Sequence, residues 1–160
     1  MSLPTPIYMR PSGQSKLRAE LKRIREVDRP AVVEAIEEAR AHGDLKENAE
    51  YHAAKEKQGM LHARMTQVED ILSRAHVIDP ATVELEKVAF GCTVSVLDLD
   101  TDTELTYTIV GSEEADAANG LISYQAPLAK ALMGKEEGDE VLFKAPKGER
   151  HFEVVGVEYG

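Results

Sequence analysis

The chain of 160 residues contains no tryptophan, and aromatic residues make up only 5% of it. That is little aromatic material for one globular core, but it is normal for a coiled coil joined to a small sheet. No apolar run approaches the ~20 residues that a membrane-spanning helix needs, so no membrane partner is expected. The first residues lack the basic-then-apolar pattern of a signal peptide. Cys92 is the single cysteine, which excludes an internal disulfide and makes a reducing cytoplasm the expected location.

Positive charge is scarce in the second half of the chain. Residues 1–76 hold 13 Lys and Arg against 12 Asp and Glu, whereas residues 77–160 hold 6 against 17. The net charge of −10 therefore lies in the C-terminal half, and two differently built parts are predicted. Nucleic-acid binding depends on neutralising phosphates, so an acidic chain argues against independent binding to RNA or DNA.

Helical periodicity dominates the first half. Leu17, Leu21 and Ile24 recur at spacings of four and three, which is typical of a coiled-coil seam. Pro30 is expected to kink or break this first helix, and the apolar phase beyond it is shifted. A second helix shows a regular alternation of spacings three and four at Tyr51, Ala54, Gln58, Leu61, Met65, Val68 and Leu72. Two antiparallel arms of about 30 residues each would extend roughly 45 Å.

A tight turn joins the two arms at Gly43, which we expect to end the first helix with a left-handed backbone. Asp44 and Glu47 follow, three residues apart on one face of the second helix. One interpretation is structural: Asp44 is the N-cap and Glu47 completes a capping box. The other is functional, because a hairpin tip is free of packing constraints and two carboxylates can bind a hard cation.

The C-terminal half changes to strand periodicity from Val88 onward. Strands are predicted at residues 93–97, 104–110, 121–124, 140–144 and 151–159. Pro127 is suited to the first position of a short helix that Gly134 closes. The fold class is therefore α+β, with a coiled-coil hairpin domain at residues 1–78 and a small antiparallel sheet domain at residues 79–160.

Residues 38–54, Glu-Ala-Arg-Ala-His-Gly-Asp-Leu-Lys-Glu-Asn-Ala-Glu-Tyr-His-Ala-Ala, resemble the hairpin tip of the bacterial Gre transcript-cleavage factors, and within that family its GreA branch. The resemblance continues through Val77-Ile78-Asp79, Phe90-Gly91 and residues 127–135. It implies that the C-terminal domain is FKBP-like. Prolyl isomerase activity does not follow, because a fold does not carry a function.

The resemblance also implies a role and a partner. In Gre factors the coiled coil enters the secondary channel of bacterial RNA polymerase, where the acidic tip helps hold a second Mg²⁺ and orients the water that cleaves backtracked nascent RNA. Asp44 and Glu47 would be the residues that act there. The polymerase would be the enzyme and this chain its activator. Two carboxylates alone make a poor Mg²⁺ site, so no cofactor is expected to bind stably outside the complex.

Further residues are candidates for contacts, and the chain is expected to act as a monomer. Candidates for contact with the RNA 3′ end or the channel are Lys46, Tyr51, Lys55, Lys57 and Arg64. Candidates for docking the C-terminal domain on the polymerase are Ser123, Pro127 and Leu128. The five histidines, at positions 42, 52, 62, 76 and 151, show no metal-ligand spacing, so no zinc site is expected.

Two other functions remain open at this stage. A Gre-like protein can occupy the secondary channel and inhibit the polymerase, although the tip sequence Asp-Leu-Lys-Glu argues against this. A plain coiled-coil adaptor, in which the tip acids are only helix caps, is the third possibility.

Overall fold

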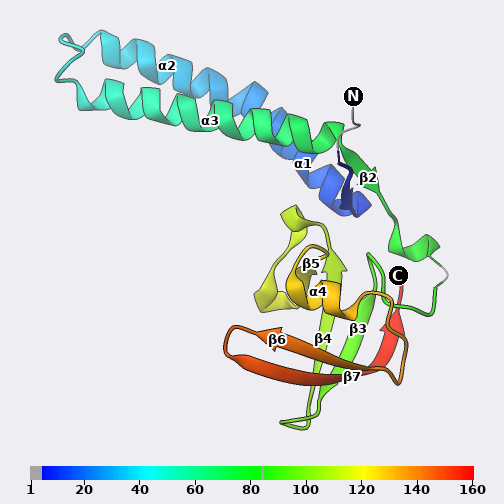
Figure 1. The fold of residues 1–160 in the computed structure, drawn as a ribbon. Helices are drawn as coiled ribbons and strands as arrows, with labels where there is room; N and C mark the ends of the chain where they lie inside the picture. Colours follow the sequence, from blue (N-terminus) through cyan, green and yellow to red (C-terminus); the bar gives the residue numbers. More distant parts are fainter. Residues whose placement is uncertain (1–4, 84) are drawn as a thin grey trace. The chain divides into compact units, whose positions relative to one another are not determined.

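The computed structural model describes residues 5–83 and 85–160, and Figure 1 shows its ribbon. The chain forms two compact units. One comprises Thr5 and Gln14–Ala75, and the other comprises Pro6–Gly13 together with His76–Gly160. Sequence analysis placed one domain boundary between residues 78 and 79; the compact units change after Ala75, and Pro6–Gly13 belongs with the C-terminal unit.

The first unit is the helical hairpin that the periodicity predicts. Its elements are α1 (Pro11–Arg23, of which the part from Gln14 belongs to this unit), the π-helical turn η1 (Ile24–Asp28), α2 (Arg29–Arg40) and α3 (Ala49–Ser73). α2 and α3 lie side by side (Figure 1). The 25 residues of α3 make it about 37 Å long, shorter than the expected arm. Of the predicted seam residues of α3, Met65 and Val68 are buried and the others are half-buried; at the end of the helix Ile71 is buried in place of the predicted Leu72.

Pro30 does not break the first arm. The helix passes continuously from α1 through η1 into α2, and the Arg29 N–H donates to the Ile24 carbonyl five residues earlier. A proline in a regular helix would clash with the carbonyl four residues before it, and a wider π turn relieves that clash. The turn adds one residue to the seam: Leu17, Ile24, Val32 and Ala39 are buried, at spacings of seven, eight and seven. The apolar phase shift in the sequence is this inserted residue.

The second unit contains a curled five-stranded mixed sheet. Its strands are β3 (Thr93–Asp98), β4 (Thr103–Val110), β5 (Leu121–Ser123), β6 (Glu140–Ala145) and β7 (Gly148–Glu158). They are ordered β5-β4-β3-β7-β6. Three of the four pairings are antiparallel, as predicted, but β5 pairs parallel with β4. The chain crosses between them through the short turns η3 (Ser112–Glu114) and η4 (Ala117–Asn119) instead of reversing in a hairpin.

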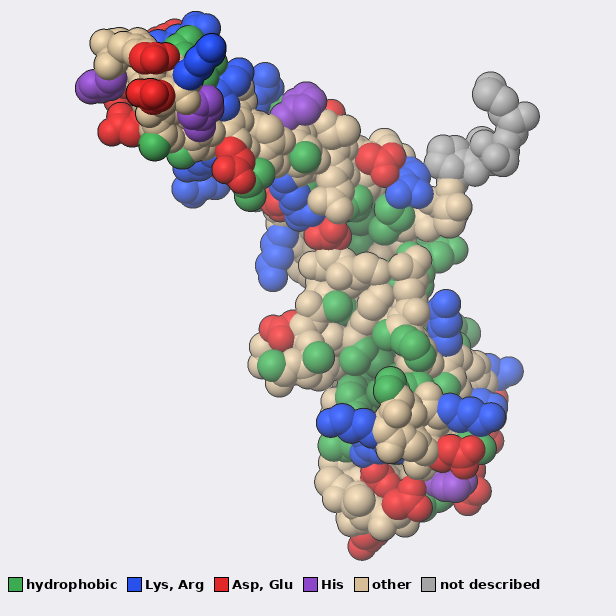
Figure 2. Space-filling view, turned by 60° about the vertical axis from the view of Figure 1, so that its left-hand side comes forward, with side chains coloured by type: hydrophobic (Ala, Val, Ile, Leu, Met, Phe, Trp, Pro, Cys, Tyr) green, Lys and Arg blue, Asp and Glu red, His purple; other side chains and the backbone are tan. Residues whose placement is uncertain are grey.

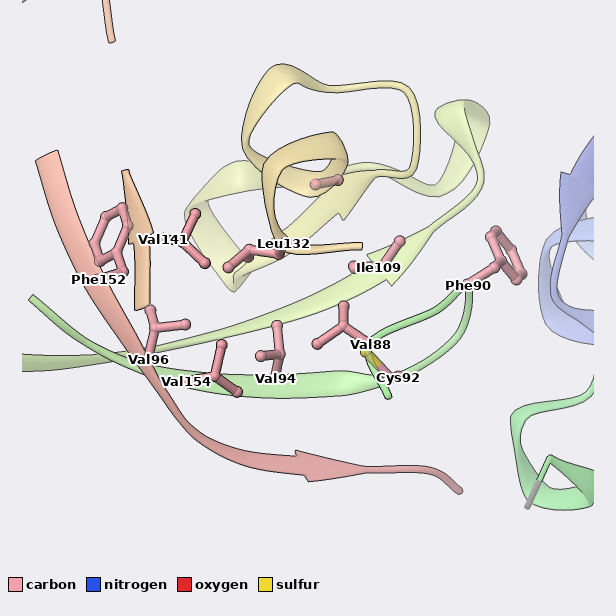
Figure 3. Close-up of a cluster of buried hydrophobic side chains, with 11 residues drawn as sticks. Val88, Phe90, Cys92, Val94, Val96, Ile109, Leu132, Val141, Phe152 and Val154 are labelled. Carbon is pink, nitrogen blue, oxygen red and sulfur yellow. The ribbon is translucent and has the colours of Figure 1, made fainter. Parts of the chain in front are cut away.

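The core of this unit lies between the sheet and the predicted short helix α4 (Pro127–Leu132). Val94 and Val96 alternate into it from β3, Phe152 and Val154 come from β7, and Leu132 comes from α4. Figure 3 shows these side chains between the helix and the strands. Cys92 is fully buried in this core, and burial raises the pKa of its thiol.

The N-terminal segment is an integral part of the second unit. β1 (Ile7–Met9) pairs with β2 (Ala75–Val77) in a two-stranded sheet. The Tyr8 ring packs against Phe90 and Tyr124, at centroid distances of 6.0 and 5.5 Å. The Arg10 guanidinium pairs with Glu114 at 2.8 Å. No helix in the described part of the chain is long and apolar enough to cross a bilayer.

Candidate functional site at the hairpin tip

The hairpin tip begins where α2 ends at Arg40. Ala41 is the C-cap, and the His42 N–H donates to the Ala39 carbonyl at 3.1 Å. Gly43 has a φ of +111°, a backbone conformation that side chains strongly disfavour. The positive φ predicted for Gly43 is thus present, but α2 already ends at Arg40 with Ala41 as its C-cap, so Gly43 lies in the loop beyond the cap.

The second arm starts later than predicted, and its N-cap is Asn48. α3 begins at Ala49, and Asn48 Oδ1 accepts a hydrogen bond from the Tyr51 N–H at 3.0 Å. Asn48 Nδ2 also donates to the Ala39 carbonyl at 2.6 Å, which ties the start of α3 to the end of α2. The predicted capping box of Asp44 and Glu47 is wrong. An ionised aspartate could accept the first bond but has no N–H for the second.

Asp44 instead shapes the loop between the helices. Its Oδ1 accepts a hydrogen bond from the Lys46 N–H at 2.9 Å, an Asx-type turn. The Lys46 carbonyl lies 3.0 Å from Nε2 of His52, which comes from the first turn of α3. The backbone of Lys46 is thus held on both sides. The Asp44 side chain remains exposed, and its second oxygen has no hydrogen-bond or ion-pair partner among the described residues.

Glu47 lies next to this turn with its side chain exposed. Within residues 5–83 and 85–160 its carboxylate forms no hydrogen bond or ion pair. Glu47 and Asp44 line one open hollow together with His42, Asn48, Ala49 and Glu50. Figure 2 shows acidic and histidine side chains gathered at this end of the hairpin.

The donor set at the tip suits a hard divalent cation. Carboxylate oxygens are the ligands that Mg²⁺ prefers, and it is usually bound by one or two carboxylates with additional ligands from water or substrate. The described residues contain no group of three or more His, Cys, Asp or Glu placed to hold a metal ion. The tip therefore offers part of a coordination sphere, which a second molecule would have to complete.

The predicted contact residues lie in three different places. Lys46 and Tyr51 belong to the tip, and Tyr51 is half-buried with its ring edge-on to His52 at 5.6 Å. Lys55 and Lys57 are exposed farther along α3, and Lys55 Nζ donates to Gln58 at 3.3 Å. Arg64 is elsewhere: its guanidinium forms two hydrogen bonds with the Glu20 carboxylate of α1, at 2.5 and 3.0 Å. Arg64 thus joins two helices and does not belong to the tip.

The three predicted docking residues lie close together in sequence around the start of α4. Ser123 Oγ is 2.8 Å from Ser112 Oγ and accepts from the Gln125 N–H at 3.1 Å. Pro127 is exposed at the start of α4, and Leu128 is half-buried against the core.

Sequence reasoning overlooked two tip residues, Asn48 and His52. Asn48 carried a usable signal, because asparagine ranks beside aspartate at N-caps. His52 carried none, because its bond to the loop depends on how the turn is folded.

Comparison with known proteins covers nearly the whole chain. The family model described as "Transcription elongation factor, N-terminal" matches residues 7–77, and the one described as "Transcription elongation factor, GreA/GreB, C-term" matches residues 82–159. Transcription elongation factor GreA of Alkalilimnicola ehrlichii is 55% identical over 148 residues, covering 92% of this chain and 94% of that protein. Its namesake from Francisella tularensis subsp. novicida is 53% identical over 154 residues, covering 96% of each chain.

Solved structures of similar proteins include GreA factor homolog 1 (Gfh1) of Thermus thermophilus. That protein is 28% identical with a TM-score of 0.44, covering 96% of this chain and 99% of its own. A GreA/GreB elongation factor from Nitrosomonas europaea is 21% identical with a TM-score of 0.43, covering 98% of this chain and 100% of its own.

Proposed function

The chain belongs to the GreA/GreB family of transcription elongation factors, which act on RNA polymerase, and we propose that its hairpin enters the polymerase secondary channel and stimulates cleavage of backtracked RNA. The polymerase remains the enzyme, and this chain is its activator. Cleavage releases the displaced 3′ end and restores a 3′ end from which synthesis resumes.

The observation that supports this proposal is that one tip residue caps α3 while the two tip carboxylates stay exposed. Asn48 caps α3, so neither Asp44 nor Glu47 is needed to start the helix. Both carboxylates are exposed, and Glu47 has no partner among the described residues. Neither acid caps α3, and Asp44 uses only one of its oxygens in the tip loop, so both carboxylates are available to a second molecule.

Each acid has a distinct part in the proposed mechanism. Asp44 and Glu47 would help to hold a second Mg²⁺ at the polymerase active centre, and that ion would supply charge stabilisation for the displacement at phosphorus. Asp44, held by its bond to the Lys46 N–H, supplies a carboxylate oxygen in a fixed position. The free Glu47 carboxylate supplies a second oxygen and accepts a hydrogen bond from the attacking water, which orients that water toward the phosphodiester. The chain alone binds no metal stably.

The remaining contacts follow from the same placement. Lys46 and Tyr51 lie beside the acids, and Lys55 and Lys57 lie farther along α3, where they face the RNA 3′ end or the channel wall. The C-terminal unit docks on the polymerase through the surface around Ser123, Pro127 and Leu128. The chain works as a cytoplasmic monomer. Arg64 has no part in this proposal, because Glu20 already occupies its guanidinium.

A transcript-cleavage assay tests the proposal. Backtracked elongation complexes with 5′-labelled RNA are incubated with the chain and then supplied with nucleotides. We expect shortened labelled RNA that is extended again, and no cleavage when the chain meets free RNA without polymerase. Slower synthesis without any shortened RNA would support the inhibitory alternative. Cleavage of free RNA by the chain alone would contradict the assignment of the polymerase as the enzyme.

A further inference from the structure

A groove on the flank of the hairpin is separate from the tip hollow and shares no lining residue with it. Arg29 and Val33 line it from α2, and Lys55, Gln58, Gly59 and His62 line it from α3. Gly59 is ten residues beyond the start of α3, which places it about 15 Å along the helix. All of these residues belong to the hairpin unit.

Gly59 has no structural reason to be glycine. It lies in the interior of α3, where glycine destabilises a helix relative to alanine. A Cβ atom at this position would meet nothing within 4 Å, and the backbone has no positive φ. The chain therefore gives up helix stability here without gaining packing space or a special conformation. What glycine does provide is a bare stretch of helix backbone that another molecule can approach closely.

Cationic groups without carboxylate partners surround this glycine. Within the described residues, the one hydrogen bond of the Arg29 side chain goes to the Met65 thioether at 3.6 Å, a weak acceptor. By contrast, Arg25 on the preceding turn pairs with Glu69 at 2.8 Å. In the described part of the chain, the Lys55 ammonium bonds only to the neutral Gln58 amide, at 3.3 Å. The groove thus holds two positive charges and no carboxylate lines it, although Arg29 also borders a neighbouring hollow that Glu34 and Glu37 line.

Apolar surface accompanies the charge. Val33 leaves 46% of its surface exposed, although valine is among the residues most often buried. Leu61 and Val32 also line the groove. A ligand that complements this lining must carry negative charge next to apolar groups. Polypeptide segments with acidic and apolar side chains have this combination. The phosphate backbone of a nucleic acid offers no comparable apolar group.

We propose that this Gly59 groove is an interaction surface for an acidic, partly apolar segment of RNA polymerase. Carboxylates of that segment pair with Arg29 and Lys55, and its backbone or a small side chain lies against Gly59. Desolvated arginine contacts of this kind are common among the residues that dominate binding energy in protein interfaces. The proposal rests on the proposed function, because it assumes that the hairpin enters the polymerase.

Substitution of Gly59 tests the proposal through two readouts that move in opposite directions. Gly59→Ala and Gly59→Leu should leave the melting temperature unchanged or raise it, because both residues form helices better than glycine. Gly59→Leu should weaken binding of the labelled full chain to polymerase at least tenfold. Ala63→Leu is the matched control, since Ala63 is exposed on α3 outside the groove. Full affinity of Gly59→Leu would overturn the proposal.

Substitution of the charged side chains provides a second test. Arg29→Gln with Lys55→Gln should weaken binding and reduce its dependence on salt, whereas Arg18→Gln, on an exposed arginine of α1, should not. With a photo-reactive amino acid in place of His62, cross-links to a polymerase polypeptide are expected. Cross-links to labelled RNA alone would overturn the choice of a protein partner.

The parent chain distinguishes failure of this proposal from failure of the proposed function. If the parent stimulates cleavage and Gly59→Leu matches it in affinity, the groove is not an interface but the function stands. If the parent neither binds polymerase nor stimulates cleavage, both proposals fail together.

Discussion

Replacement of Asn48 by alanine should destabilise the hairpin although it removes no charge and no apolar contact of the seam. The substitution removes the acceptor for the Tyr51 N–H and the donor to the Ala39 carbonyl. Loss of an N-cap costs about 1 kcal/mol, and loss of a further hydrogen bond costs about 1 kcal/mol. A total of about 2 kcal/mol in a unit of this size corresponds to a fall of roughly 10 °C in melting temperature.

Thermal melting followed by circular dichroism at the helix band measures this change. Asn48→Asp keeps the cap acceptor, gains a favourable charge at the helix N-terminus and loses only the donor, so an intermediate melting temperature is expected. Asp44→Asn keeps the acceptor for the Lys46 N–H and should melt like the parent. If Asn48→Ala melts like the parent while Asp44→Ala melts lower, the capping role belongs to Asp44 and our assignment is wrong.

Three further changes test other parts of the structure. The hydrogen bond from Arg150 lowers the pKa of Asp98 from its ordinary value of 3.8. The ionised carboxylate therefore stabilises the fold above that value, and this stabilisation is lost as pH falls through the depressed pKa. Asp98→Asn should flatten the acid limb of a plot of melting temperature against pH. Gly111→Ala should destabilise by about 1–3 kcal/mol in denaturant titration, because the added Cβ would lie 2.6 Å from the Tyr8 carbonyl oxygen; an unchanged midpoint would show that the N-terminal strand does not pack there. His52→Leu removes the bond to the tip loop and should reduce cleavage stimulation several-fold with polymerase affinity retained, whereas His52→Gln, which keeps an N–H donor, should recover part of it.

Local patterns in the sequence were sufficient to predict the two helices of the hairpin. The alternating spacing of Tyr51 to Leu72 predicted the contact face of α3, because helix periodicity alone decides which residues share a face. The same spacing analysis detected the phase shift beside Pro30 but assigned it to a kink or break. The continuous π turn was missed because a single inserted residue and a broken helix leave the same mark on a heptad pattern.

The tip shows why a local spacing pattern can assign the N-cap of a helix to the wrong residue. Asp44 and Glu47 have the spacing of a capping box, and that pattern is local. The start of α3 is instead decided by Asn48, whose side chain bonds to Ala39 across the hairpin. That bond depends on the two helices being packed together, so sequence spacing could not rank Asn48 above Asp44.

Contacts between residues far apart in the chain could not be predicted from the sequence in the C-terminal unit. The strands were found from their alternation, but β5 joins β4 in parallel through an irregular crossover that has no periodic signal. Tyr8 lies in a proline-punctuated segment, and nothing local indicates that its ring meets Tyr124 more than a hundred residues later. Nothing local in the sequence indicates that Asp98 is buried and paired with Arg150 from another strand.

We propose above that Asp44 and Glu47 complete the site of a second Mg²⁺ ion, which the polymerase alone binds weakly. The most direct measurement is the rate of RNA cleavage in backtracked complexes as a function of Mg²⁺ concentration, with the parent chain and with an Asp44→Asn, Glu47→Gln double variant. The account predicts that the parent lowers the Mg²⁺ concentration needed for cleavage. The double variant should bind polymerase and melt nearly as the parent does but leave that concentration where the polymerase alone has it. Full stimulation by the double variant at low Mg²⁺ would contradict the account.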